Sequence, residues 1–430
     1  MSKKTNKFDA RVQTPERHQQ EWRPLSLDEL IAEDHLARLI WDYVQKVDLT
    51  RVYQEIRATS TRPGRSPIAP EILLSLWLYA TLESIGSARE IARRCERDLA
   101  FMWICGGVPV NYHTISDFRK DHVDVLEDFL RTSVVSLVDN NLVSLDRIAQ
   151  DGMRVRASAG RSSFRRKPTL EQLNQQCQEH LNALKDDASQ EVSKRKQAAK
   201  KRAAEDRAKR LEQAIEEQKE LAEAREKRRK GSGEETRCST TDPEARTMKM
   251  ANGGYDAAFN VQLATDTGSR IITGVEVTNA GTDANELCPM LEKLKENYGK
   301  QPNEVLVDSA YATQAAVTEL EQAGIKVIAG IPRKQQLINN NKDPYSRQKR
   351  DTEEYVTFRV RMSKKEAQEA YKKRSSVAEF VNAVFRNNGL QQFLVRGLKK
   401  VKAVALLHAI AHNFRQMLAW GMFGSTSYSR

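Results

Sequence analysis

The N-terminal third of the chain places its apolar residues at helical spacing. In the segment APEILLSLWLYATLES they recur three and four positions apart, and Pro70 suits a first helical turn. Ser87 with Glu90 three positions later has the pattern of a capping box and predicts another helix start. We therefore expect a helical domain at residues 25–142, preceded by a flexible segment at residues 1–24.

A further helix is predicted after a glycine-containing stretch that ends at Pro109, because Thr114 with Asp117 three positions on is again typical of a helix start. Two helices joined by such a short segment can form a helix-turn-helix. Side chains near the start of the second helix would then contact DNA, and these are His113, Arg119 and Lys120. A helical bundle with a solvated basic face explains the same pattern equally well.

From Ser144 the pattern becomes that of a strand, and it is followed by a long polar run. Residues 169–230 contain no glycine or proline and keep apolar positions three and four apart near both ends. A weak centre at residues 186–190 favours a helical hairpin over one long helix. Such a run is usually a solvated surface arm, whereas its basic stretches KRKQAAKKR and REKRRK favour an arm that grips DNA or forms a dimer.

Strand and helix patterns then alternate. Two β-branched segments joined around Thr267 and Gly268 predict a β-hairpin. After it the chain predicts, in order, a helix at 284–299, a strand at 304–310, a helix at 313–324, a strand at 325–331, an irregular polar segment at 333–355, and helices at 363–388 and 397–420. We expect an α+β fold in which residues 143–420 form a mixed sheet flanked by helices, with 160–235 as a helical insertion and 421–430 as a tail.

The net charge of the chain indicates which class of partner it binds. The chain has 70 Lys and Arg against 58 Asp and Glu, a net charge of +12, which favours nucleic acid first and a membrane surface second. No apolar run approaches the roughly 20 residues that span a bilayer, and the first residues lack an apolar signal-peptide core. The five cysteines are scattered and form no CxxC pair. These features predict a reduced, cytoplasmic protein without a disulfide framework or a zinc site.

Two aspartates lie in strand patterns. Asp308 follows the run VLV at the carboxyl end of a predicted strand, where α/β sheets bind their ligands, and Thr313 is better placed to cap the next helix. Asp151 is followed by Gly152, a pair typical of a two-residue hairpin, so its own pattern favours a turn. A functional Asp308 would nevertheless need a partner on a neighbouring strand, and Asp151 is the candidate.

Glu379 is the third candidate carboxylate. At 100° per residue it falls opposite the apolar stripe of its helix, beside Asn382 and Arg386, an arrangement that a solvated helix face also explains. Two-metal phosphodiester chemistry needs hard oxygen ligands from different elements that hold ions ~4 Å apart. Two strand aspartates and a helix glutamate in a basic chain therefore suggest metal-dependent chemistry on DNA.

Other candidate ligands have simpler explanations. Asp242 precedes a proline and predicts a turn, Asp256 enters a strand, and Asp283 is expected to cap a helix. His408 and His412 have a spacing that can bind metal, but they lack the Glu of HExxH and lie on a helix expected to pack in the core.

Taken together, several segments resemble those of bacterial insertion-sequence transposases of the DDE class. They are RPGRSPIAPEILLSLWLYA, NYHTISDFRKDH, DGMRVRAS, STTDPEARTMKM, GYDAAFNVQLATD, VLVDSAYAT and AEFVNAVFRNNGLQQFLVRG. The resemblance implies a ribonuclease-H-like catalytic core in which Asp151, Asp308 and Glu379 are the catalytic, metal-binding residues. It also implies two Mg²⁺ ions, for which Mn²⁺ can substitute. The expected partner is double-stranded DNA, both the terminal inverted repeats and the target, bound by a homodimer associated with the bacterial nucleoid.

The glutamate helix departs from the family spacing. Related transposases carry a Tyr, an Arg three positions on, a Glu four after that, and a basic residue seven beyond the Glu. Tyr371, Arg374 and Arg386 keep the outer spacings, but Glu379 is five residues after Arg374. In a regular helix the extra residue turns Arg374 by about 100°, so that Arg386 is the stronger candidate for a DNA contact. A bulge would return Arg374 to the side of Glu379.

The sequence thus predicts a transposase that cleaves the ends of its own element and joins the 3′-OH ends to target DNA. A catalytically silent DNA-binding protein, such as a repressor, is an alternative, although the presence of all three carboxylates argues against it. A stand-alone metal-dependent nuclease of the same fold is another alternative. It would cut DNA without joining it.

Overall fold

The structure is a computed structural model that describes residues 18, 26–56, 66–186 and 194–423. The segment expected to be flexible at residues 1–24 lies almost wholly outside the described residues, as does most of the expected tail at 421–430. Within the described residues, no helix is long and apolar enough to cross a membrane.

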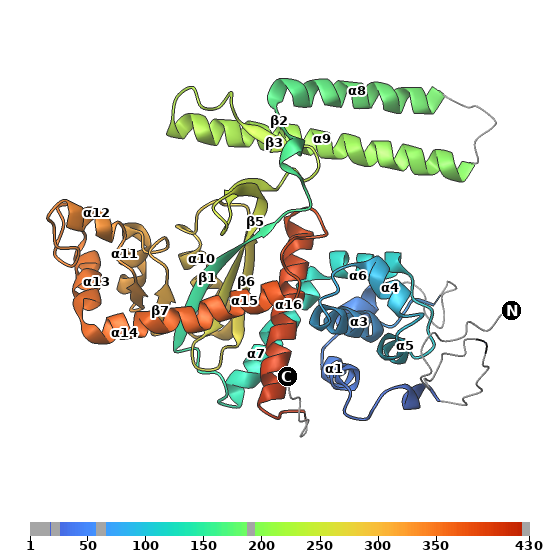
Figure 1. Cartoon of the computed structure of the whole chain (residues 1–430), viewed down its shortest axis with the longest axis horizontal. Helices are drawn as coiled ribbons and strands as arrows, with labels where there is room; N and C mark the ends of the chain where they lie inside the picture. Colours follow the sequence, from blue (N-terminus) through green and yellow to red (C-terminus); the bar gives the residue numbers. More distant parts are fainter. Residues whose placement is uncertain (1–17, 19–25, 57–65, 187–193, 424–430) are drawn as a thin grey trace, which may run out of the picture.

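The N-terminal region is helical, as predicted, and packs around one buried helix (Figure 1). Its elements are a 3₁₀ helix at Leu27–Leu30 and the helices α1 (Leu36–Val44), α2 (Thr50–Glu55), α3 (Pro70–Leu82), α4 (Ala88–Arg94), α5 (Leu99–Cys105), α6 (Tyr112–Asp121) and α7 (Val123–Asp139). Pro70 is the first residue of α3, and Ser87 caps α4 by accepting the Glu90 N–H. Almost every side chain of α3 is buried, because α1, α5, α6 and the last helix of the chain surround it.

The start of α6 differs from the sequence prediction. Asn111 caps the helix, and its side-chain oxygen accepts the N–H of Thr114 at 3.0 Å. Thr114 therefore lies inside the first turn and does not cap it. Asparagine is as good a cap as threonine, so the pattern of Thr114 with Asp117 pointed to a site three residues too late.

Six strands of the described chain form one mixed sheet, which confirms the α+β fold class. The strands are β1 (Arg147–Arg156), β4 (Arg246–Lys249), β5 (Tyr255–Asp266), β6 (Ile272–Thr278), β7 (Glu304–Val307) and β8 (Lys326–Ala329). Their order is β4-β5-β1-β7-β8, with β6 also paired to β5. β1 is antiparallel to β5 and parallel to β7, so it joins the hairpin half of the sheet to the alternating helix and strand half.

Two helices alternate with the last strands of the sheet: α10 (Leu287–Tyr298) comes between β6 and β7, and α11 (Gln314–Gln322) between β7 and β8. The helices that follow β8 are α12 (Lys334–Asn339), α13 (Glu353–Ser363), α14 (Lys365–Arg374) and α15 (Phe380–Asn387). The segment 333–355, expected to be irregular, contains α12 and the start of α13. A buried ion pair between Arg359 and Asp351, 2.7 Å long, and a bond from Arg359 to the Pro344 carbonyl hold this polar segment in place.

The last helix, α16 (Leu398–Ala419), lies between the sheet and the N-terminal helices (Figure 1). Its contacts reach β6 on one side and α7, α3 and α6 on the other. Asn413 bonds both the N–H and the carbonyl of Ile272, which fixes the helix to strand β6. His408 and His412 are buried in this packing, and burial lowers the pKa of each imidazole to about 4. As predicted, both histidines belong to the core.

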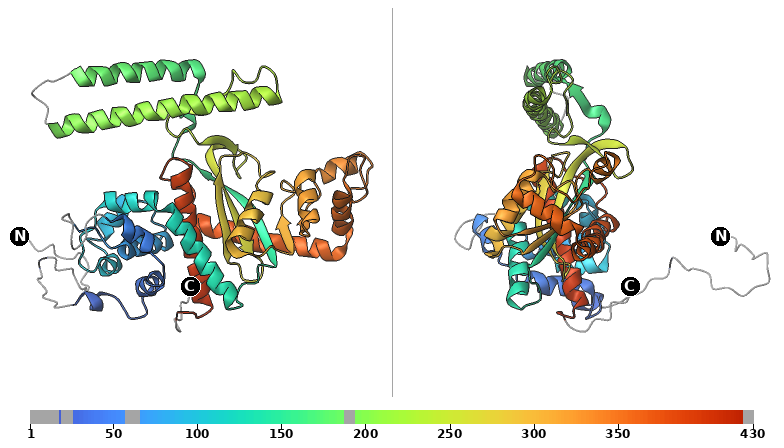
Figure 2. Two further views of the ribbon diagram at one scale, coloured as in Figure 1. Left: turned by 180° about the vertical axis from the view of Figure 1, so that it is seen from behind. Right: turned by 90° about the vertical axis from the view of Figure 1, so that its left-hand side faces the viewer.

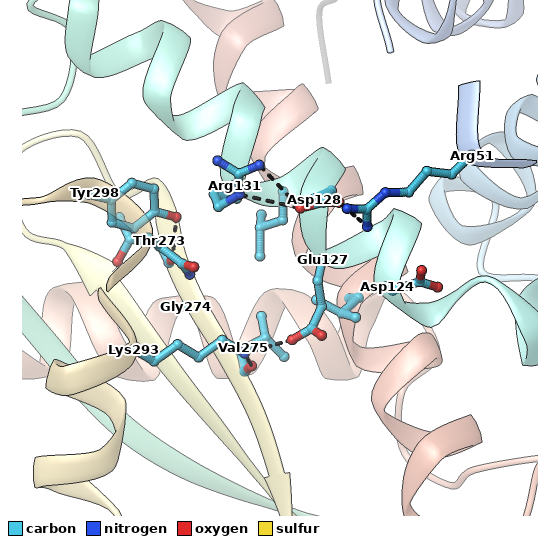
Figure 3. Close-up of a pocket in the computed structure, with 13 residues that line it drawn as sticks. Arg51, Asp124, Glu127, Asp128, Arg131, Thr273, Gly274, Val275, Lys293 and Tyr298 are labelled. Carbon is cyan, nitrogen blue, oxygen red and sulfur yellow. Dashed lines mark hydrogen bonds and ion pairs between the residues drawn. The ribbon is translucent and has the colours of Figure 1, made fainter. Parts of the chain in front are cut away.

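An ion network holds the same layers together at a second place. Figure 3 shows a pocket of about 220 Å³ between α7, β6 and α10, where Lys293 pairs with Glu127 at 2.7 Å and with Glu276. Lys402 of α16 pairs with both carboxylates as well, at 2.8 and 3.2 Å. The two lysines and two glutamates of this network connect the sheet to the helical region, and none of the three candidate carboxylates takes part in it.

The predicted arm is a helical hairpin. Helices α8 (Lys167–Asp186) and α9 (Lys194–Arg228) pack through a small apolar cluster, and the expected weak centre falls largely outside the described residues. The short strands β2 (Phe164–Arg166) and β3 (Arg237–Ser239) pair at its base. Figures 1 and 2 show the arm apart from the sheet, with its distal end over the N-terminal helices.

Candidate active site

Strand β1 runs straight through Asp151 and Gly152. Asp151 faces Leu263 in the antiparallel ladder with β5, and the pairing continues without a break on both sides. The hairpin interpretation of the Asp-Gly pair is therefore wrong. Glycine is needed for a different reason, because a Cβ at position 152 would lie 2.5 Å from both the Asp283 carboxylate and the Gln262 amide.

Asp308 comes directly after β7, the parallel neighbour of β1. Their register pairs Ala149 with Leu306, and two more residues along each strand bring Asp151 beside Asp308. The Oδ1 atom of Asp308 accepts the Ser309 N–H at 2.7 Å and the Tyr371 hydroxyl at 3.5 Å. The following helix, α11, is capped by Thr313, as the sequence predicted. The carboxylate of Asp308 is therefore not used as a helix cap.

A π-helix at Ser375–Glu379 absorbs the extra residue in the glutamate helix. Arg374 consequently lies beside Glu379, with its Nη2 atom 3.4 Å from Oε1, and the prediction from a regular helix is wrong. Its Nη1 atom is also 3.6 Å from Oδ2 of Asp151. The guanidinium, whose side chain is only 13% exposed, thus lies between the strand aspartate and the helix glutamate.

Asn382 also contacts the site, a role that sequence reasoning did not assign. Its Nδ2 atom donates to Oδ2 of Asp151 at 3.0 Å, and the residue is buried. The sequence pattern had placed Asn382 next to Glu379 on the helix face. The sequence showed only that Asn382 lies one turn from Glu379; its burial appears in the structure, where a buried polar side chain is normally hydrogen-bonded.

The electrostatics of the site centre on Asp151. Burial, with smaller contributions from the nearby carboxylates of Asp283 and Asp308, raises the pKa of Asp151 to about 6. Arg374 and the N–H of Gly152 act in the opposite direction. Burial and the neighbouring Asp308 likewise raise the pKa of the Tyr371 hydroxyl. Burial is thus the main cause of both raised pKa values, and the neighbouring carboxylates add to it.

The three carboxylates do not form one ligand cluster in this structure. Among the described residues, no group of three or more His, Cys, Asp or Glu side chains is arranged to hold a metal ion. Glu379 is 60% exposed and directed to Arg374, while Asp151 lies on β1 and Asp308 directly after the neighbouring strand β7. Carboxylate oxygens are nevertheless the hard donors that divalent cations prefer, and the carboxylates of Asp151 and Asp308 are close enough for Asp308 to raise the pKa of Asp151 slightly. The donor set fits such a cation.

Two family models match the chain. The family described as Transposase domain (DUF772) matches residues 25–121, and the family described as Transposase DDE domain matches residues 235–414, so that together they cover more than half of the sequence. The chain belongs to the DDE transposases of insertion sequences. No curated protein and no solved structure matches it.

Membership in this family makes the chain a DNA transposase with a ribonuclease-H-like catalytic domain, and it implies dependence on a divalent metal. Asp308 and Glu379 lie inside the matched DDE region. Asp151 lies between the two matched regions, so its place in the site depends on the register of β1 with β7.

Of the other aspartates in this transposase, Asp283 differs from its prediction. It does not cap α10, whose first helical residue follows Glu286. Its carboxylate instead accepts bonds from Asn260 at 2.6 Å and Gln262 at 2.8 Å, and it pairs with Arg154. This buried network lies directly behind Gly152, where Asp283 adds to the negative charge near Asp151.

Asp242 and Asp256 agree with their predictions. The carbonyl of Asp242 accepts the Ala245 N–H in a turn, and Asp256 is the second residue of β5. The buried carboxylate of Asp242 also accepts the N–H of Gly397 at the start of α16. Both residues therefore have structural roles in the transposase.

The candidate DNA contacts on α6 differ in their accessibility. Arg119 is buried, with its guanidinium 4.0 Å from the Trp77 ring and bonded to the Gly86 carbonyl, unlike an exposed recognition-helix side chain. Lys120 pairs with Asp117 at 3.0 Å. His113 is exposed. The remaining candidate DNA contact, Arg386, lies near the end of α15 and is exposed as well.

Proposed function

We propose that this transposase binds the ends of its own mobile element, cleaves them, and joins the 3′-OH ends to target DNA. Asp151, Asp308 and Glu379 are the proposed metal-binding, catalytic residues. The observation that carries this proposal is the position of Arg374 between Asp151 and Glu379, on a helix that packs near β7, the strand that Asp308 directly follows. Three separate elements supply these groups, which two-metal chemistry requires.

Two Mg²⁺ ions are the proposed cofactors, with Mn²⁺ as a substitute. Bound there, they would activate a water or a 3′-hydroxyl for attack on the scissile phosphate and stabilise the leaving oxygen. The chain's own part is to supply anionic oxygens and to fix their positions. Asn382 orients the Asp151 carboxylate, and Tyr371 contacts that of Asp308.

Basic and polar residues around the carboxylates are proposed to hold DNA. Arg374, Tyr371 and Arg386 belong to the helical segment that carries Glu379, so they are placed to contact the phosphates next to the cut. His113 and Lys120 are proposed to contact DNA from the helical domain. Because an element has two ends, a homodimer bound to the terminal inverted repeats is the proposed assembly.

Incubation of the full chain with its own element ends and Mg²⁺ tests the proposal. Nicks at the element ends and products joined to target DNA are both expected, and both should disappear in EDTA. Cutting without joining would instead support a stand-alone nuclease. Binding with no metal-dependent cutting would support a repressor.

A further inference from the structure

A basic hollow lies between the N-terminal helices and the DDE region. It has a volume of about 410 Å³ and opens between α6 and the start of α16. Its polar lining comes from three stretches of the chain that are far apart in sequence. The groups that matter are Ser116, Arg119, Lys120, Ser158, Arg396 and Lys400.

The hollow is fixed to the strand and to the helix that carry the candidate carboxylates. Arg396 donates from Nε to the Ser158 carbonyl at 3.3 Å, just beyond the end of β1. The segment after α15 is bonded to the same strand end, through Phe393 N–H to the Arg156 carbonyl at 2.8 Å. A ligand in the hollow would therefore contact α6, the residue Ser158 just after β1, and the segment that joins α15 to α16.

We infer that this basic hollow binds the phosphodiester backbone of the DNA duplex that enters the active site. The inference rests on the proposed function and adds a second contact point away from the cut. Four cationic side chains and one carboxylate, Asp117, line the hollow, and Lys120 pairs both with Asp117 and with the neighbouring Asp121. Guanidinium, ammonium and hydroxyl groups are the donors that position DNA phosphates without reading sequence.

The burial of Arg119 fits this role better than it fits base recognition. A guanidinium held against Trp77 and the Gly86 carbonyl cannot extend into a groove, but it can present a fixed charge at the wall of the hollow. Arg396 and Lys400 are exposed and supply the mobile charges at the opposite wall. Arg119, Arg396 and Lys400 together give the hollow a positively charged lining, where the two matched regions meet.

The spacing along β1 suits a duplex. Ser158 lies seven positions after Asp151, two beyond the end of β1, and at about 3.3 Å per residue this stretch covers at most about 23 Å. Successive phosphates of one DNA strand are about 3.4 Å apart along the duplex axis. A duplex cut at Asp151 would therefore reach the hollow roughly seven nucleotides from the cleaved bond.

Charge removal at the open wall tests the inference. The double variant Arg396→Gln/Lys400→Gln is compared with Lys399→Gln, an exposed neighbour on the same helix that does not line the hollow. Duplex affinity is measured over a range of salt without divalent metal. The double variant should lower the slope of log K against log salt by about 2, since each phosphate contact contributes about 0.9, while Lys399→Gln keeps the wild-type slope.

Phosphate ethylation locates the contact. In wild-type complexes, ethylation roughly seven nucleotides from the cut should interfere with binding, and this interference should vanish in the double variant. The charge-preserving variant Arg396→Lys/Lys400→Arg should restore both the slope and the interference, which separates charge from a folding defect. An unchanged slope, or interference that persists in the double variant, would overturn the inference.

The outcomes for the hollow and for the proposed function are separable. Wild-type protein that cuts and joins element ends, together with an unaltered salt slope in the double variant, would reject only the hollow. The opposite result is a wild type that binds duplex DNA but never cuts it, with a double variant whose salt slope and ethylation interference are reduced. That result would support the hollow and reject the proposed chemistry.

Discussion

The guanidinium of Arg374 lies 3.4 Å from the carboxylate of Glu379, across one turn of π-helix. The two residues are five positions apart, and a π-helix brings positions i and i+5 onto one face, as an α-helix does for i and i+4. The extra residue in this chain therefore leaves the relation between the two side chains intact. Because Arg374 also lies near Asp151, its positive charge is placed where the three proposed ligands would hold cations.

Replacing Arg374 with glutamine should strengthen divalent metal binding in the DNA-free protein and weaken binding to element ends. The guanidinium offsets negative charge at Asp151 and Glu379, so its removal favours a cation by roughly 1.4 kcal/mol, or about tenfold in affinity. Titration with Mn²⁺, followed calorimetrically, measures the first effect, and a duplex binding assay measures the second.

Arg386→Gln serves as the control, since Arg386 is exposed at the end of α15 and has no ion pair with the carboxylates among the described residues. It should weaken end binding without altering metal affinity. Equal metal affinity in wild type and Arg374→Gln would contradict the proposed electrostatic role of Arg374.

Replacing Asp308 with asparagine should abolish cleavage and leave DNA binding nearly intact. The change removes a hard anionic ligand at constant shape, while the bonds to Ser309 N–H and Tyr371 can still form. Asp256→Asn is a matched control, because this aspartate is the second residue of β5 and its carboxylate accepts the N–H of Ala257. Metal-dependent nicking that survives in Asp308→Asn would remove Asp308 from the site.

Sequence periodicity predicted most of the fold, because the arm, the β5–β6 hairpin and the strands around Asp308 have strong local patterns. The prediction from periodicity was wrong where the same local pattern is compatible with two different structures. Asp151 with Gly152 is typical of a turn, yet here the glycine admits the carboxylate of Asp283 against a straight strand. Only the tertiary packing of Asp283 distinguishes these cases, and it lies more than a hundred residues away.

The glutamate helix shows the same limit in another form. Counting residues on a regular helix rotated Arg374 away from Glu379, whereas the structure adds a π-turn at Ser375–Glu379. Local sequence does not predict such a π-turn reliably, because tertiary contacts provide the free energy that offsets its unfavourable backbone geometry. Here those contacts include Asn382 with Asp151 across the interface of helix and strand.

Replacing Asp151 with asparagine should stabilise the metal-free fold at pH 7.5 while eliminating cleavage. Burial raises the pKa of Asp151 from 3.8 to about 6, so the folded state binds more protons than the unfolded state between these values. Stability contributed by this group is therefore lost as pH rises from about 4 to 6. Above pH 6 the ionised carboxylate costs roughly 2–3 kcal/mol, and the neutral amide avoids this cost.

Chemical denaturation at pH 4 and pH 7.5, in EDTA, measures this difference. The variant and the wild type should have similar free energies of unfolding at pH 4 and should diverge at pH 7.5. Because Asp242 also has a pKa raised to about 6, the wild-type profile alone would combine both groups. If the variant is less stable than the wild type at pH 7.5, the ionised Asp151 carboxylate does not destabilise the metal-free fold and the prediction is wrong.

Replacing residues 169–230 with a short Gly/Ser linker should leave a folded core. The arm packs on itself through Cys177, Leu181 and Leu211, and this cluster is separate from the main core. At its base Leu170 and Ala214 pack against Cys238, and Glu217 pairs with Arg246 of β4. Their loss should lower stability by about 1–3 kcal/mol, the scale of one buried apolar side chain. Aggregation would show instead that the arm covers core surface.

The same deletion should flatten the salt dependence of DNA binding, because charge is unevenly distributed along α9. Residues 194–210, in its distal half, carry nine Lys and Arg against two Asp and Glu, and this half extends over the N-terminal helices (Figure 2). Neutralising three exposed basic residues there should lower the slope by up to about 2.7, whereas three near the base should not. The distal set is Lys200, Lys201 and Arg202, and the basal control set is Lys219, Arg225 and Lys227. Equal slopes for the two variants would identify the arm as a solvated extension without a grip on DNA.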